Sequence, residues 1–227
     1  MAVPSRRWRI AGLTFLTLAC MACNPLAVPY FLMIGPDPKN DPDFKLAAAD
    51  KRKPIKVVVL VSAPLDIRCG ELANVERELT ALFSQKLQEA CKQNRENIIV
   101  ASHSKVQKFK DDHPMWQTLS LEELGKQLDS DYVIDLEINH ISLYEPGSQN
   151  TLFLGKASIS VSVANVSKPG DGPVFRKVVG CEYPKSGSRS VVDTDPLKFH
   201  RDFMTKLATE MTWLFTPHST DDEHTCE

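Results

Sequence analysis

The stretch from Leu121 to Tyr183 constrains the fold most, because it joins a well-signalled short helix to three segments with the pattern of strands. Ser120–Glu123 has the S-x-x-E form of a capping box, in which a hydroxyl and a carboxylate accept hydrogen bonds from backbone N–H groups at a helix start. Apolar and polar side chains then alternate along residues 132–139 and 157–163, as in strands with one buried face. We therefore expect a capped helix followed by a three-strand antiparallel meander.

The polar face of this meander carries acidic and amide side chains on its first strand and small hydroxyls on its second. Two interpretations compete: a surface on which a partner protein docks, because small side chains leave the sheet flat, and a face that is simply solvated. The candidate partner-binding residues are Asp135, Glu137, Asn139, Ser158, Ser160 and Ser162.

The segments on either side of this stretch predict the rest of the fold. Val57–Val61 is an apolar, mostly β-branched run, typical of a strand covered on both faces. Apolar residues then recur at three- and four-residue steps from Leu72 to Ala90, predicting a long helix, and residues 98–101 form a short strand. Asp195, as the N-cap before a proline, begins a C-terminal helix. The expected class is α/β, with a mixed five-stranded sheet built from a βαβ unit, the capped helix, the meander and that last helix.

The N-terminus has the pattern of a targeting signal. Arg6, Arg7 and Arg9 precede an apolar run from Ile10 to Ala19, which is too short to span a membrane. The end of this run, Thr17–Cys20, resembles a bacterial lipobox, which implies cleavage after Ala19 and a lipid anchor on the cysteine. Cys20 is therefore the candidate lipidation site and Cys23 the runner-up. An uncleaved anchor helix and a plain cleaved signal remain alternatives.

We divide the chain accordingly into a lipoprotein signal peptide (1–19), a proline-rich tether (20–54), an α/β domain (55–216) and a flexible acidic tail (217–227). Prolines punctuate the tether and favour extended backbone. Without the signal, 24 basic residues face 29 acidic ones, and no basic stripe of the kind that nucleic acid requires is present. We expect no nucleic-acid partner.

No sequence motif for catalysis is evident: the chain has no Gly-rich phosphate loop, no G-x-S-x-G and no H-E-x-x-H. We therefore expect neither an enzyme nor a cofactor or metal. His218, His224 and Cys226 are potential metal donors, but a solvated tail is the simpler interpretation. The sharpest alternative is the loop from Asp66 to Cys69, which follows the carboxyl end of the first strand, where open α/β sheets usually hold ligands.

The cysteines of the expected mature domain leave the disulfide pattern open. Cys69 and Cys91 bracket the long helix and would lie roughly 30 Å apart, so they cannot pair with each other. Either of them can pair with Cys181, Cys226 is also available, and a buried, reduced thiol is an equal alternative.

The order of the elements, with Leu124–Val133 leading into the meander, resembles a family of envelope lipoproteins. Its members include the curli-secretion lipoprotein, the lipoprotein activator of a penicillin-binding protein and the N-terminal domain of the Tol-system propeller protein. The shared pattern is Leu-Gly-x-x-Leu-x-x-Asp-Tyr-Val, in which Gly125 and Asp131 shape the turn from helix to strand. It implies a fold and not an activity. The chain lacks the long membrane-inserting hairpin of the channel-forming member.

These observations predict a membrane-anchored, non-catalytic envelope lipoprotein on the periplasmic side, whose α/β domain binds another envelope protein. One alternative is a small-molecule-binding or enzymatic domain that uses the Asp66–Cys69 loop. Another is a subunit of an oligomeric export assembly. The partner, the choice of membrane and the oligomeric state stay open.

Overall fold

The computed structural model describes residues 39–46, 53–68, 70–168, 170 and 172–219. The main sheet and its helices belong to one unit of the chain, which begins at Asn40. The elements, in chain order, are β1 (Lys39–Asn40), β2 (Ile55–Ser62), η1 (Gly70–Leu72), α3 (Val75–Gln93), β3 (Ile98–Val100), α4 (His103–Asp112), η2 (Trp116–Thr118), α5 (Leu121–Gln127), β4 (Tyr132–Tyr144), β5 (Leu152–Asn165), β6 (Phe175–Tyr183), β7 (Arg189–Ser190), α6 (Pro196–Trp213) and β8 (His218–Ser219).

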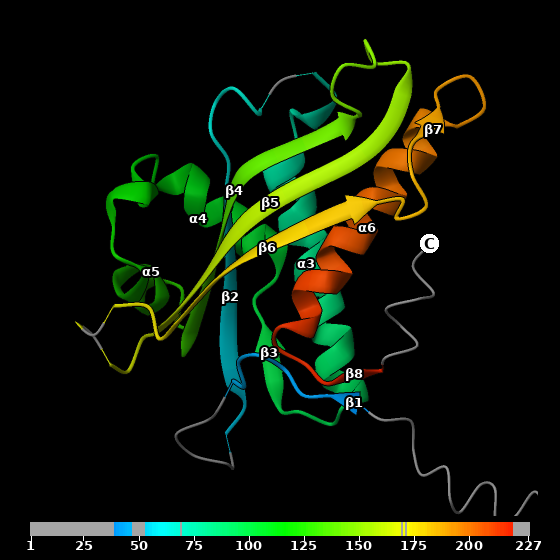
Figure 1. The fold of residues 1–227 in the computed structure, drawn as a ribbon. Helices are drawn as coiled ribbons and strands as arrows, with labels where there is room; N and C mark the ends of the chain where they lie inside the picture. The colour runs from blue at the N-terminus through cyan, green and yellow to red at the C-terminus, as the bar shows by residue number, and fades with distance from the viewer. Residues whose placement is uncertain (1–38, 47–52, 69, 169, 171, 220–227) are drawn as a thin grey trace, which may run out of the picture. The chain divides into compact units, whose positions relative to one another are not determined.

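The main sheet has the order β3-β2-β4-β5-β6 (Figure 1). β2 is parallel to β3 and β4, whereas β4, β5 and β6 form the antiparallel meander. This confirms the predicted α/β class and its mixed sheet. The structure adds a sixth short strand, β7, which pairs with the start of β5. Two residues are too few to show a strand pattern, so the sequence predicts only a loop in this segment.

One face of the sheet is covered by α3 and α6, which lie side by side behind it in Figure 1. Their apolar stripes meet the inward residues of β2, β4 and β5 in the large core. Phe83 on α3 and Phe203, Leu207 and Met211 on α6 are fully buried there. The helical periodicity in the sequence therefore corresponds to the side that each helix buries.

The other face is only partly covered. α4 and α5 lie over β2 and the first residues of β4, where Val58, Leu60 and Val133 meet Phe109 and Leu124 in a smaller core. Among the described residues, no helix lies over the rest of the meander on this side (Figure 1). The sheet thus presents an uncovered surface made by β4, β5 and β6.

The short helix α5 begins with the predicted capping box. Ser120 Oγ accepts from Glu123 N at 3.2 Å, and Glu123 Oε2 accepts from Ser120 N at 3.0 Å. At its other end a Cβ on Gly125 would collide with side chains of Val166 and Val133, so only glycine fits. Asp131 Oδ2 accepts from the Lys56 N–H at 2.8 Å and so joins the turn to β2.

The packed unit starts earlier than residue 55, within the segment predicted to be tether. Phe44 N donates to Leu214 O at 2.9 Å, and its ring lies 5.2 Å from that of Phe175. Leu46 is 6% exposed. Two apolar residues in a polar, proline-rich run form no periodic pattern, so no local signal predicts this docking. At the opposite end, β8 occupies the first residues of the predicted tail and pairs with β1.

Gly155 on β5 offers a test of this packing. A Cβ at this position would lie 2.5 to 2.9 Å from ring atoms of Phe203, which is fully buried. We expect Gly155→Ala to lower the free energy of unfolding by about 1–3 kcal/mol, through overpacking. The measurement is the midpoint of urea unfolding.

Gly180→Ala on the adjacent strand β6 is the matched control, because a Cβ there meets nothing closer than 4.0 Å. It should leave stability unchanged or raise it slightly, since alanine restricts the unfolded chain. Equal midpoints for the two variants would contradict the packing described for β5 and α6.

Candidate functional site

The predicted partner-binding residues lie on the same side of the sheet, with Asp135 half-buried where the helical cover ends. Asp135 pairs with Ser162 across β4 and β5, and Glu137 pairs with Ser160. Asn139 Nδ2 donates to Ser160 Oγ at 2.8 Å. The register shifts between Ile138 and His140, so His140, rather than Asn139, is opposite Ser158. The six residues therefore form one surface, and His140 joins them. The alternation breaks at Asn139-His140 in the sequence, which is the only signal of this bulge.

The third strand contributes residues that the sequence pattern did not assign to this surface. Arg176, Val178 and Gly180 lie opposite Ser162, Ser160 and Ser158. Next along the pair, Lys156 Nζ lies 3.1 Å from Glu182 Oε2. Val178 is 61% exposed, an unusual position for a valine in the middle of a strand. The alternate residues Phe175, Val179, Cys181 and Tyr183 pack in the large core, which leaves Val178 pointing outward.

We call this surface the open face. It has three columns of residues: acidic and amide groups on β4, serines on β5, and Arg176, Val178, Gly180 and Glu182 on β6. The serine side chains are short and extend little beyond the backbone of β5, so the surface of another molecule can approach this strand closely.

A groove of about 310 Å³ adjoins the open face where the helical cover ends. Its apolar wall comes from Trp116 and from leucines of α5 and the segment before it, while Asp135 and Glu137 form its acidic side. Lys110 connects this wall to β2, because its Nζ donates to Val61 O at 2.7 Å and lies 4.3 Å from the centroid of the Trp116 ring. Burial lowers the pKa of Lys110, with Glu76 and Asp135 opposing that effect.

Asp135 is the most perturbed carboxyl of the groove. Burial raises its pKa to about 6, the charge of Glu137 adds to this, and Lys110 opposes it. A carboxylate placed where ionisation is costly is typical of a binding or reactive position rather than of a solvated surface. The group therefore suits recognition of a cation.

A second cavity, of about 230 Å³, lies at the carboxyl edge of β2 and β3. Of the loop predicted as the alternative ligand site, Arg68 lines this cavity, Asp66 is exposed elsewhere, and Cys69 lies outside the described residues. Arg68 Nη1 lies 3.6 Å from Glu76 Oε1, and the same carboxylate oxygen accepts from Ala63 N at 2.7 Å.

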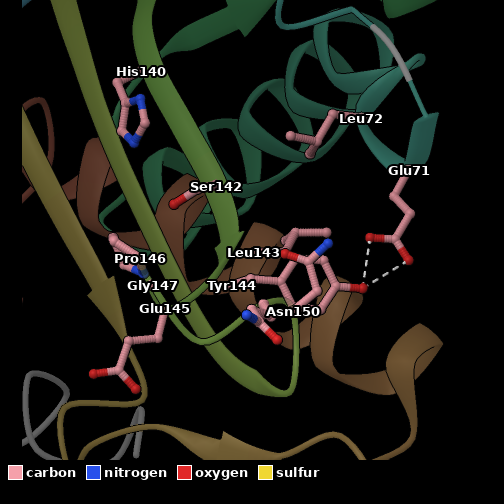
Figure 2. Close-up of a pocket in the computed structure, with 11 residues that line it drawn as sticks. Glu71, Leu72, His140, Ser142, Leu143, Tyr144, Glu145, Pro146, Gly147 and Asn150 are labelled. Atoms are coloured by element: carbon pink, nitrogen blue, oxygen red, sulfur yellow. Dashed lines mark hydrogen bonds between the residues drawn. The ribbon is translucent and has the colours of Figure 1, made fainter.

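A third hollow, of about 610 Å³, lies between η1 and the turn that joins β4 to β5 (Figure 2). The Tyr144 hydroxyl donates to the Glu71 carboxylate, at 3.0 and 3.2 Å from its two oxygens. Burial and this carboxylate raise the pKa of Tyr144. The contact joins η1 to the end of β4, while Glu145 points away from it in Figure 2. The sequence predicts only a turn in this region.

The remaining predicted sites divide between two outcomes. Cys20, Cys23 and Cys226 lie outside the described residues, so the lipidation site stays a prediction. Cys91 and Cys181 are both buried and free, so they do not pair with each other. Burial raises the pKa of the Cys91 thiol to about 12, and it also raises that of Cys181.

Within the described part of the chain, no group of three or more histidine, cysteine, aspartate or glutamate side chains is arranged to hold a metal ion. A search of the same residues for a helix of membrane-spanning length and hydropathy found none.

No family model matches the chain, and no curated protein matches it. Solved structures similar to it include bacterial lipoproteins. Lipoprotein GNA1162 from Neisseria meningitidis is 11% identical, with a TM-score of 0.43 over 70% of this chain and 98% of that one. The PelC dodecamer from Paraburkholderia phytofirmans is 11% identical, with a TM-score of 0.41 over 80% and 99%. Protein XCC0632 from Xanthomonas campestris is 11% identical, with a TM-score of 0.41 over 78% and 90%. Similarity at this level says nothing about function.

Asp135→Asn tests the electrostatics of the groove. The carboxyl is ionised at neutral pH in both states, but its folded pKa is about 6 against an ordinary 3.8, so ionisation destabilises the fold. Two pKa units correspond to about 3 kcal/mol, and relaxation of the site lowers this. We expect the asparagine variant to be about 1–3 kcal/mol more stable than the native protein at pH 7.5.

The stability difference should fall as the pH drops through 6, and it should vanish below about pH 4, where the carboxyl is protonated in both states. Urea unfolding at a series of pH values measures it. A difference that does not change between pH 4 and 7.5 would contradict the raised pKa.

Proposed function

We propose that this chain is a membrane-anchored, non-catalytic envelope lipoprotein whose α/β domain binds another envelope protein through the open face. A lipid on Cys20 holds it at the periplasmic side of a membrane. Its resemblance to the curli-secretion, penicillin-binding-protein-activator and Tol-propeller families is part of this proposal. It rests on the Leu124–Val133 pattern in the sequence.

One observation carries the binding role: three adjacent strands are buried on one side by α3 and α6 and present a continuous uncovered surface on the other. Within that surface Val178 is 61% exposed, and the serine column beside it leaves room for a partner to approach. A surface that serves solubility alone is rich in charged side chains, and the serine column with Val178 and Gly180 departs from that composition.

The chemistry of the open face and its groove indicates a partner with basic side chains. Asp135 and Glu137 present two carboxylates at the edge of an apolar wall. A lysine or arginine on the partner would place its charge against them and its aliphatic stem against Trp116. Ion pairs that are partly withdrawn from water contribute more than exposed ones. A basic side chain of the partner therefore binds in the groove, and the partner surface around that side chain packs on the serine column.

The binding role is tested by a photo-crosslinking amino acid at position 178 in envelope membranes. We expect a defined adduct that is heavier than the chain by the mass of one other protein. The same amino acid at Gln85, an exposed position on α3 on the opposite side of the sheet, should give none.

Charge reversal identifies the contact. Glu137→Lys should abolish the adduct from position 178, because it places a cation against the basic partner. Glu89→Lys on α3 makes the same charge change away from the open face and should leave the adduct intact. An adduct that both variants leave unchanged would contradict the assignment, and an adduct of twice the chain's own mass would mean that a second copy occupies the face.

Recognition should also depend on pH. Because the pKa of Asp135 is about 6, it is mainly protonated at pH 5 and mainly ionised at pH 7.5. We expect the adduct yield at pH 5 to be several-fold lower than at pH 7.5, and Asp135→Asn to be equally poor at both. A native yield that is the same at both values would remove Asp135 from the contact.

The anchor has its own test, in which Cys20→Ser is compared with Cys23→Ser by detergent phase partition. The Cys20 variant should move to the aqueous phase, because it has lost the acylated thiol, while the Cys23 variant should stay with the detergent. If the Cys23 variant alone moves, the lipidation site lies three residues later. If both partition like the native chain, the lipobox assignment is wrong.

A further inference from the structure

The second cavity lies where two connections of the sheet diverge. The chain leaves β2 through α3, on one face of the sheet, and leaves the adjacent β3 through α4, on the other face. A crevice opens between the carboxyl ends of two parallel strands whose connections part in this way, and open α/β sheets bind ligands there. The cavity is lined by the loop after β2, the start of α3 and one side of α4.

Positive charge is in excess around this cavity. Arg68, Arg77 and Lys110 line it, against one carboxylate, Glu76. Glu76 is already engaged, since it accepts from Ala63 N and is paired with Arg68. Burial is the main cause of the lowered pKa of Lys110, and repulsion from the charge of Arg68 adds a smaller lowering. An anion placed between them would relieve that repulsion.

Polar nitrogens here are buried without a partner. Arg68 Nε and His103 Nδ1 are both withdrawn from solvent, and neither makes a hydrogen bond in the described structure. A buried polar atom left without a hydrogen-bond partner costs about 1–3 kcal/mol, so such atoms usually mark a missing ligand or water. They belong to different elements, the loop after β2 and the first turn of α4, and both residues line the same cavity.

The two helices add to the positive potential. Asn74 is the N-cap of the 19-residue helix α3, but its side chain makes no capping hydrogen bond. His103 is the first residue of α4. The first turns of both helices therefore border the cavity, and helix N-termini favour negative charge. At about 230 Å³ the cavity is below the roughly 300–1,000 Å³ typical of drug-sized ligands, which suits one small anion.

We propose that the cavity between the ends of β2 and β3 is a binding site for a phosphate dianion, either free phosphate or a phosphomonoester. Arg68 donates to it through its guanidinium, His103 through its ring and Arg77 as a second cation. Lys110 contributes positive charge, and one of the three donors of its ammonium group is engaged by Val61 O. The site is separate from the open face and does not depend on the partner proposed for that face.

The test is isothermal titration of the full chain in detergent with inorganic phosphate and with glycerol 3-phosphate, at constant ionic strength. We expect saturable binding of one equivalent. Arg68→Gln and Arg77→Gln should each weaken it about tenfold or more, the typical effect of losing a charged hydrogen-bond partner. Arg201→Gln, an exposed arginine on α6, is the matched control and should bind like the native chain.

Arg77 is exposed, so its variant keeps the fold even if the loss of Arg68 disturbs the loop. No saturable heat with either compound would overturn the proposal, as would equal affinity in Arg68→Gln, Arg77→Gln and the native chain. Glycerophosphocholine, a phosphodiester, is the third titrant. If it binds while phosphate and the monoester do not, the site recognises a lipid headgroup and the dianion assignment is wrong.

Discussion

The pairing of β4 with β5 is the interaction on which the rest of the structure depends. These are the two longest strands, and their register places Ile134, Leu136 and Ile138 on the same side as Val161 and Val163. All five are fully buried beneath α3 and α6. A register slip of one residue would turn every one of them to the other face. The same register that builds the core therefore also sets the acidic and serine columns side by side on the open face.

The uneven cover of the sheet follows from how much apolar surface each helix offers. α3 and α6 have 19 and 18 residues and shield one face from β3 to β6. α4 and α5 have 10 and 7 residues, enough to cover β2 and the start of β4 only. The open face begins where this smaller cover ends, and the groove that contains Asp135 marks that boundary. Lys110 lies between the groove and the second cavity, since Asp135 of the groove and Glu76 of the cavity both oppose the lowering of its pKa.

Local sequence patterns predicted those features that one segment determines by itself. Period-two alternation located β4 and β5, and the capping box located the start of α5 to the residue. Features that need two distant segments were not predictable. Phe44 packs on Phe175 and Leu214, which are distant in the sequence. Arg68 and His103 line the same second cavity only because the fold brings α3 and α4 together. His140 was missed for a local reason, because a bulge disturbs the alternation that identifies an outward side chain.

The proposed role depends most on the open face being covered by another molecule in the envelope. The direct measurement is the rate of maleimide labelling of a Val178→Cys variant in intact envelopes and in the purified, detergent-solubilised protein, read from the peptide that contains residue 178. We predict that labelling is at least several-fold slower in envelopes and that Glu137→Lys restores the fast rate. Equal rates in the two preparations would mean that the face is open to solvent, and the proposed binding role would be wrong.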